Sequence, residues 1–362
     1  MRCTTRTHLY ASRSLTMNDY NATLREKYLE AFNQEIREEI TGLTEGQFIE
    51  KYESEKTWSI GPFSLRGDLT FSKLSQMPDP TQIGWTSSSI FNPSIIEHDG
   101  KIFLFYRAAV KKESLGSRIG LAVFTPGVGW QESANNPVIY PTQDNEILSV
   151  EDPKVYRYGA DKFIMFYNGA WSASPAQIAE YEKPYGDIAV DINYALSSDL
   201  VHWEKMGLAV PYSTSKLWAK GAVIPRDGQG NATKINGEYL MFISEGCGGT
   251  QVLGRSENML DWRFEPCTYL PLPAEMGTHI YEVACAVVDG DNLILDFMYN
   301  SHTNEHLGAQ VRYSFDDVSK PIEFTSNATL AWGGMIKYQG KWLFAQGWDA
   351  PAGSEEIYFY NA

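Results

Sequence analysis

The chain has 362 residues and a formal net charge of −15, from 30 Lys and Arg against 45 Asp and Glu. An acidic excess of this size argues against a protein that neutralises the phosphate backbone of a nucleic acid. Hydrophobic residues make up 43% of the chain, enough for the core of one large domain or two small ones. Aromatic residues make up 13%; such rings either pack between β-strands or line sugar sites.

The four cysteines show neither the paired spacing of a zinc site nor the density of a disulfide scaffold. No apolar run in the sequence is long enough to span a bilayer. The first residues are rich in Arg, Thr and Ser but lack an apolar segment, so they do not predict a secretory signal. We therefore expect a cytoplasmic protein without metal or cofactor, and without a nucleic-acid or membrane partner.

Residues 18–56 predict helices, because Leu24, Tyr28 and Phe32 recur at helical spacing with charged residues between them. The pattern is amphipathic and offers no acidic residue at a position typical of a pocket. We expect residues 1–57 to form a helical extension that packs against the rest of the chain or against a second subunit of a homo-oligomer. We expect it to contribute nothing to the chemistry.

From residue 58 onwards, short apolar and aromatic runs alternate with turns rich in Gly, Asp, Asn and Pro, which is a strand-and-turn pattern. One phrase recurs: a small or apolar strand, a turn with glycine, and an aromatic-rich strand. Its copies begin at Asn92, Asp152, Gly221, Val283 and Gly333, and their turn glycines are Gly100, Gly159, Gly237, Gly290 and Gly340.

A third strand follows each copy, beginning at Ile119, Ile192, Gln251, Leu307 and Glu355. The second and third copies share a Ser-x-x-Leu-x-Trp ending, at Ser198–Trp203 and, one residue longer, at Ser256–Trp262. Repetition of a multi-stranded unit predicts an all-β, five-bladed β-propeller over residues 58–362. A β-sandwich would not repeat an inner-strand phrase in this way.

Polar residues at the ends of the innermost strands are the candidates for a central pocket. They are Asn92, Arg107, Asp152, Lys154, Lys220, Glu245, Glu282, His302 and Asp349. A single one of them is as well explained by a solvated rim, but repetition in several blades favours a pocket. Asp152 precedes a proline, which predicts an extended conformation aimed at the axis, although Asp-Pro is also a common turn dipeptide.

These motifs resemble glycoside hydrolase family 130, the β-mannoside phosphorylases and β-1,2-mannosidases, over roughly residues 85–362. The resemblance rests on Asn92-Pro93 with Tyr106-Arg107, on Glu151-Asp152-Pro153 and, more weakly, on Ser198–Trp203, on the Lys220 to Pro225 stretch and on Gly347-Trp348-Asp349. It implies a five-bladed propeller in which Asp152 is the proton donor. It also implies that Asn92, Arg107 and Asp349 hold the sugar in the −1 subsite, and we add Lys220 and His302 as further candidates for binding substrate.

The chain departs from the phosphorylases of that family at two places. It has Lys154 where they usually have Arg, and Ser244-Glu245 where they typically carry a His-Arg pair. A phosphate site needs several charge-assisted donors, Arg above all. The hydrolytic branch of the family instead has two glutamates where phosphate would lie, and Glu245 and Glu282 are placed to be that pair. The plainer interpretation is that Glu245 lies at the rim or that Glu282 only binds a backbone amide.

The sequence therefore predicts an inverting, exo-acting hydrolase of β-linked mannosides, with β-1,2 linkages preferred. Asp152 would be a general acid whose enclosed site raises its pKa, and Glu245 and Glu282 would activate water. The alternatives are a β-mannoside phosphorylase that releases mannose 1-phosphate and a propeller that only binds glycans. Asn92 stands where other five-bladed glycosidases place an ionisable Asp, which argues against the sucrose/fructan and arabinan/xylan families.

Overall fold

A computed structural model describes residues 56–72, 84–86, 89–110, 116–325, 333–347 and 356–362. The predicted helices of residues 18–56 lie outside the described residues, except for position 56, and stay a prediction. In the described part of the chain, the strands form five antiparallel sheets. Two α-helices are described, α3 (Pro175–Tyr181) and α4 (Tyr212–Ser215), and neither is long or apolar enough to cross a bilayer.

The first four sheets each take four consecutive strands of the chain. Blade one has β3 (Ser89–His98), β4 (Lys101–Ala109), β5 (Arg118–Thr125) and β6 (Gly129–Glu132). Blade two has β7 (Ser149–Gly159), β8 (Lys162–Ser172), β9 (Ile188–Ser197) and β10 (Glu204–Leu208). Blade three has β11 (Ala219–Val223), β12 (Tyr239–Gly246), β13 (Val252–Ser256) and β14 (Arg263–Pro266). Blade four has β15 (His279–Asp289), β16 (Asn292–Asn300), β17 (His306–Tyr313) and β18 (Glu323–Phe324).

The fifth sheet joins both ends of the described chain. Its strands are β19 (Gly333–Tyr338), β20 (Lys341–Gln346) and β21 (Glu356–Asn361), with β1 (Ser64–Leu65) and β2 (Phe71–Ser72) paired to β21. The segment before β1 also reaches blade four, because the Trp58 indole donates to Glu323 at 2.7 Å. A strand from the start and strands from the end of one chain therefore close the ring.

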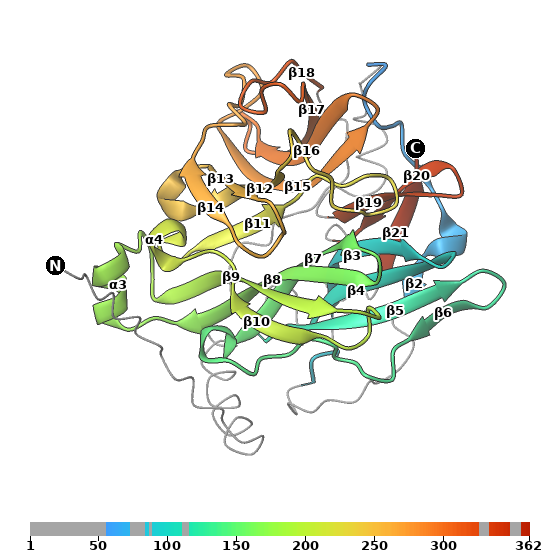
Figure 1. The fold of residues 1–362 in the computed structure, drawn as a ribbon, viewed down its shortest axis with the longest axis horizontal. Helices are drawn as coiled ribbons and strands as arrows, with labels where there is room; N and C mark the ends of the chain where they lie inside the picture. Colours follow the sequence, from blue (N-terminus) through green and yellow to red (C-terminus); the bar gives the residue numbers. More distant parts are fainter. Residues whose placement is uncertain (1–55, 73–83, 87–88, 111–115, 326–332, 348–355) are drawn as a thin grey trace.

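The first strands of the five sheets form that ring. Strand β3 contacts β7, β7 contacts β11, β11 contacts β15, β15 contacts β19, and β19 returns to β3. Figure 1 shows the five sheets following one another in chain order, from the teal blade one to the red blade five. The predicted five-bladed β-propeller is confirmed.

The core lies in layers between neighbouring blades. Strand β8 is buried at every position except its two end residues, because the sheets on either side cover both of its faces. This is why the second strands appear in the sequence as continuous aromatic and aliphatic runs and not as alternating ones. Truncation of one such side chain to alanine, for instance at Phe166, would cost about 3–5 kcal/mol.

Two details of the predicted repeat change in the structure. In blade two the left-handed turn residue is Asp161, with φ of 48°, whereas Gly159 belongs to β7. The shared serine is Ser197, whose Oγ accepts from the amide of Leu200, just as Ser256 Oγ accepts from Met259. The motifs Ser197–Trp203 and Ser256–Trp262 thus have equal length. The extra residue that the sequence analysis assigned to Ser256–Trp262 does not exist.

Candidate active site

The inner strands of blades one and two each contain a bulge at an X-Pro dipeptide. In β7, Glu151 pairs with Asn168 and Lys154 with Phe166, so Asp152 and Pro153 lie opposite one residue. The backbone of Asp152 is left-handed, with φ of 50°, and Asn92 at the matching bulge of β3 has φ of 45°. The extended conformation predicted for Asp152 is therefore wrong. Non-glycine residues in this region cost about 1–3 kcal/mol each and cluster at functional sites.

The two bulges bring the side chains of blades one, two and three together. Asp152 Oδ1 accepts from Asn92 Nδ2 at 2.6 Å and from Arg107 Nη1 at 3.1 Å, and its Oδ2 lies 3.3 Å from Lys220 Nζ. Glu151 repeats this bridge, since it accepts from Arg107 Nη2 at 2.9 Å and from Lys220 Nζ at 3.0 Å. Arg107 and Lys220 are thus fixed between two carboxylates.

These donors control the charge of Asp152. Burial alone would raise the pKa of this carboxyl, but Lys220, Arg107 and the hydrogen bond from Asn92 together hold it well below its ordinary value. The sequence analysis expected a raised pKa, and in the unliganded protein that expectation is wrong. Asp152 is ionised there at neutral pH.

Glu245 has the opposite environment. It lies near the end of β12 and pairs in register with Lys220 of β11. Burial raises the pKa of Glu245 to about 7; Lys220 opposes this effect, and the negative charges of Glu282 and Asp152 add to it. Glu245 therefore titrates near neutral pH and is partly protonated there.

Glu282 enters from β15 of blade four. Its Oε1 lies 3.8 Å from Lys154 Nζ, which also donates to the carbonyl of Ala284 at 2.8 Å. Gly221, with φ of 68°, leaves room for it: a Cβ at that position would lie 3.1 Å from Glu282 Cγ. Ser244 joins the same two blades, because its Oγ accepts from the Val283 amide at 2.9 Å.

A pocket opens among these side chains, lined by Asn92, Pro93, Asp152, Pro153, Lys154 and Glu282. Of the predicted site residues, the structure gathers Asn92, Arg107, Asp152, Lys220, Glu245 and Glu282 around it. The described residues contain no group of His, Cys, Asp and Glu that could hold a metal ion. The chemistry on offer is acid–base chemistry between carboxyl groups.

Two predicted residues are not part of this cluster. His302 is exposed in the turn between β16 and β17, where its Nε2 donates to the carbonyl of Ala274 at 2.7 Å. That turn joins the second and third strands of blade four, so it lies outward from the inner strands. Asp349 lies outside the described residues. The sequence analysis did not select Glu151, which is 2% exposed; its place beside Asp152 in the Glu-Asp-Pro motif was the available signal.

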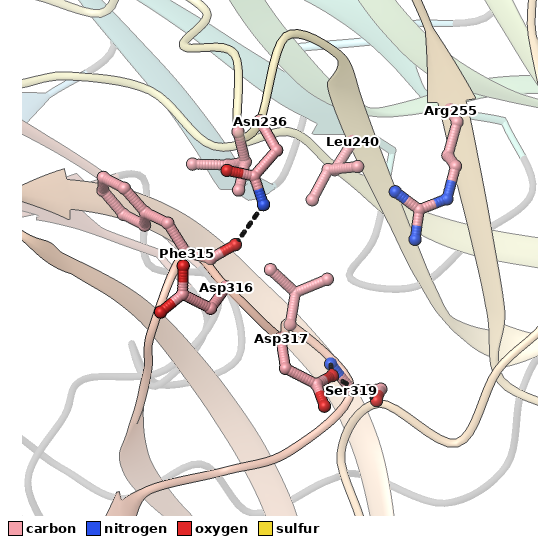
Figure 2. Close-up of a pocket in the computed structure, with 9 residues that line it drawn as sticks. Asn236, Leu240, Arg255, Phe315, Asp316, Asp317 and Ser319 are labelled. Atoms are coloured by element: carbon pink, nitrogen blue, oxygen red, sulfur yellow. Dashed lines mark hydrogen bonds between the residues drawn. The ribbon is translucent and has the colours of Figure 1, made fainter.

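A second cavity lies at the other end of the propeller (Figure 2). It is lined by Ile235, Asn236, Leu240, Arg255 and the segment from Phe315 to Ser319. Asn236 precedes β12 and Glu245 lies at the far end of that strand, so the cavity and the carboxylates occupy opposite faces. Arg255 is also held by Glu265 at 3.0 Å, and no cluster of buried acids lies among the lining residues.

The chain matches one known protein family by sequence. The family model Glyco_hydro_130, described as beta-1,4-mannooligosaccharide phosphorylase, matches residues 71–282, more than half of the chain. The match spans the bulges of Asn92 and Asp152 and ends at Glu282. A sequence search among curated proteins found no match.

Solved structures share the fold at low identity. One is a glycoside hydrolase described as putative from Parabacteroides distasonis, with a TM-score of 0.66, 20% identity, and coverage of 85% of this chain and 98% of that one. Another has a TM-score of 0.65, 20% identity, and coverage of 86% of this chain and 96% of that one. Its description states that the GH130 family of mannoside phosphorylases contains glycoside hydrolases that target β-1,2 mannosidic linkages in Candida mannan. A β-1,2-mannobiose phosphorylase from Listeria innocua has a TM-score of 0.55, 12% identity, and coverage of 75% and 89%.

Proposed function

The chain belongs to glycoside hydrolase family 130, whose members act on β-mannosides, and from this premise we propose that it is an inverting, exo-acting β-mannoside hydrolase with a preference for β-1,2 linkages. The observation that carries the proposal is that Glu245 and Glu282 lie in the same site as Asp152. Both glutamates are close enough for the charge of Glu282 to raise the pKa of Glu245.

In this mechanism, Asp152 protonates the leaving oxygen while a carboxylate of the glutamate pair removes a proton from the attacking water. Inverting hydrolysis needs the acid and the base on opposite sides of the scissile bond, about 6.5–9.5 Å apart, with room for that water. Asp152 lies on blade two, and the two glutamates lie on blades three and four. The bond to be broken would lie between them.

The acid role requires Asp152 to gain a proton when substrate binds. In the unliganded protein Asn92, Arg107 and Lys220 stabilise its charge. A sugar placed over Asn92 and Arg107 would exclude water and compete for these donors, and both changes raise the pKa of a carboxyl. Glu245, which is partly protonated near neutral pH, would be the source of the proton that Asp152 gains. Once it has lost this proton, Glu245 would be a carboxylate that can accept from water.

The sugar would be held by groups that are already fixed. Arg107 is 4% exposed and tied to Glu151 and to Ser117 Oγ at 2.8 Å, so its guanidinium needs no reordering when substrate arrives. The backbone of Asn92 is fixed, because its backbone N–H donates to the carbonyl of Gly347 at 2.9 Å. We retain Asp349 as a sugar ligand from the family resemblance.

Phosphorolysis is the second candidate. It is favoured by the cations Lys154 and Lys220 beside the pocket and by the description of the matching family model. Against it, Lys154 is engaged by Ala284 and Glu282, and Lys220 lies between Glu151 and Asp152. A phosphate dianion entering this poorly screened pocket would be repelled by Glu282, and also by Glu245 when Glu245 is ionised.

Product analysis on a panel of β-mannobioses, with and without phosphate, tests the proposal. We expect equal turnover in phosphate-free buffer, and proton NMR should show α-mannose as the first product. Strict dependence on phosphate with formation of mannose 1-phosphate would replace hydrolysis by phosphorolysis. Binding of mannosides without turnover under either condition would identify a propeller that only binds glycans.

A further inference from the structure

A further cavity, distinct from the one in Figure 2, lies next to the catalytic pocket where the inner strands of the five blades meet; we call it the axial cavity. All five blades line it, through Ser94 of β3, Lys154 of β7, Arg226 after β11, Cys285 of β15 and Gly334 of β19. Lys154 and Pro93 line both this axial cavity and the catalytic pocket. The two spaces are therefore neighbours along the axis.

Arg226 is the dominant group of the axial cavity, and it is 4% exposed. Its Nη1 donates to the carbonyls of Ile95 at 3.0 Å and Val155 at 3.5 Å. Its Nε and Nη2 have no hydrogen-bond acceptor among the residues that the structure describes. Gly334 makes room for the guanidinium, because a Cβ there would lie 3.2 Å from Nη2. A buried cation with donors left over is costly unless something accepts from them.

The charged side chains that line the axial cavity are both cations, although Asp296 pairs in register with the lining residue Cys285. Lys154 and Arg226 contribute two cations, and no carboxylate is among the described residues that line the space. Burial raises the pKa of the Cys285 thiol, so the sulfur keeps its proton and adds a weak donor. Lys154 Nζ lies 3.8 Å from Glu282, which lines the catalytic pocket and not the axial cavity.

The size of the axial cavity limits its occupant. The cavity leaves about 10 Å³ for the centre of an occupant, which is room for one occupant of about the size of a water molecule. Phosphate and sulfate, each with four oxygens around the central atom, are too large for it. We propose that the axial cavity is a binding site for a single monovalent anion of halide size, held by Arg226 and Lys154.

This site does not depend on hydrolysis being the reaction, because none of the proposed acid and base residues lines it, although Lys154 lies between it and Glu282. The anion would receive hydrogen bonds from Arg226 Nε and Nη2 and a charge contact from Lys154. Because residues of all five blades line the cavity, the site exists only in the folded propeller. Binding of the anion should therefore stabilise the folded state relative to the unfolded chain.

Bromide diffraction tests the position of the site directly. Crystals of the full chain grown in sodium bromide should show an anomalous peak on the propeller axis, within hydrogen-bond distance of the Arg226 guanidinium. The peak should be absent from crystals grown in sodium gluconate. A bromide crystal without an anomalous peak at Arg226 would assign the space to water and overturn the proposal.

Thermal unfolding gives a second, independent test. At equal ionic strength, chloride at about ten times its dissociation constant should raise Tm over gluconate by about 2–4 °C. Arg226→Met should abolish this difference, whereas the matched control Arg263→Met, at an exposed position of β14, should preserve it. An equal rise in both variants would show a general salt effect and would contradict the site. If Arg226→Met does not fold, the bromide experiment on the unaltered chain decides alone.

Discussion

The two halves of the catalytic pocket carry the same kinds of side chain in opposite electrostatic states. On the side of blades one and two, Glu151 and Asp152 are bound by Arg107, Lys220 and Asn92. On the side of blades three and four, Lys220 lowers the pKa of Glu245 less than burial and the neighbouring carboxylates raise it. Asp152 consequently has a lowered pKa, whereas the pKa of Glu245 rises to about 7.

The difference shows that fixed donors, and not residue type, set protonation in this site. Both carboxyls are buried, and burial would raise the pKa of each. Of the two, only Asp152 has three donors within 3.3 Å of its oxygens, Asn92 and Arg107 from blade one and Lys220 from blade three. Without substrate, Asp152 is thus ionised at neutral pH, whereas Glu245 titrates near neutral pH.

The largest effect is expected from Asp152→Asn, which removes the proposed acid while preserving shape. General acid–base catalysis contributes about 10²–10⁴-fold, so kcat on an unactivated β-mannobiose should fall by about that factor. Substrates with a leaving group that needs no protonation should retain far more of their turnover. Steady-state kinetics on the two substrate types measures the difference.

The matched control for that variant is Asp99→Asn, at an exposed left-handed turn position between β3 and β4. It should leave kcat unchanged. If Asp152→Asn keeps near wild-type turnover and an unchanged Tm, Asp152 is not the acid, and the comparison between the two halves loses its functional meaning.

The other half is tested by Glu245→Gln and Glu282→Gln, one at a time. The variant that lacks the base should lose about 10²–10³-fold in kcat, with little change in KM, because the base acts on water and not on bound sugar. The second glutamate should matter less. Azide, supplied as an external nucleophile, should restore turnover only to the base variant. Equal, small losses in both would remove the glutamate pair from the mechanism.

The fold was predictable from the sequence because its signal is local and repeated. Each inner strand, glycine turn and aromatic strand is contiguous, so five copies could be recognised without knowing how they pack. The charge of Asp152 was not predictable in this way. Its donors Arg107 and Lys220 lie 45 and 68 residues away along the chain, and their contact depends on how the blades close.

The left-handed bulge was hidden for a related reason. An Asp before proline favours extended backbone when only its neighbours are considered, but Asn92 and Asp152 occupy bulges that tertiary hydrogen bonds hold in place. Glu151, which binds Arg107 and Lys220, had no signal except its place beside Asp152 in the Glu-Asp-Pro motif. Motif recognition finds the reacting groups, and tertiary structure decides their protonation.

Lys220→Met should sharpen the comparison by removing a cation that acts on both Asp152 and Glu245. Lys220 lowers the pKa of Glu245 and of Asp152, so its loss should raise both pKa values. If ionised Glu245 is the base, the acidic limb of the kcat/KM profile should move to higher pH by about one unit. Lys220→Arg should restore the limb towards its original position. Lys216→Met, which removes a lysine paired with the exposed Glu182, should leave the profile unchanged.

The smallest effect concerns stability and follows from the pKa of Glu245, about 7 in the folded protein against an ordinary 4.5. Between these values the folded state holds the proton and the unfolded state does not, so the contribution of Glu245 to stability falls as pH rises and is least favourable above about 7. Glu245→Gln lacks this titration. Relative to the unaltered protein its Tm should be higher by a few degrees at pH 8 and nearly equal at pH 4.5, even though its activity falls. Scanning calorimetry at both pH values measures this.

Glu265→Gln, at a more exposed position of β14, controls for the loss of one negative charge. A Tm of Glu245→Gln below that of the unaltered protein at pH 8 would mean that Lys220 fully compensates Glu245, and the two halves of the pocket would then be electrostatically alike.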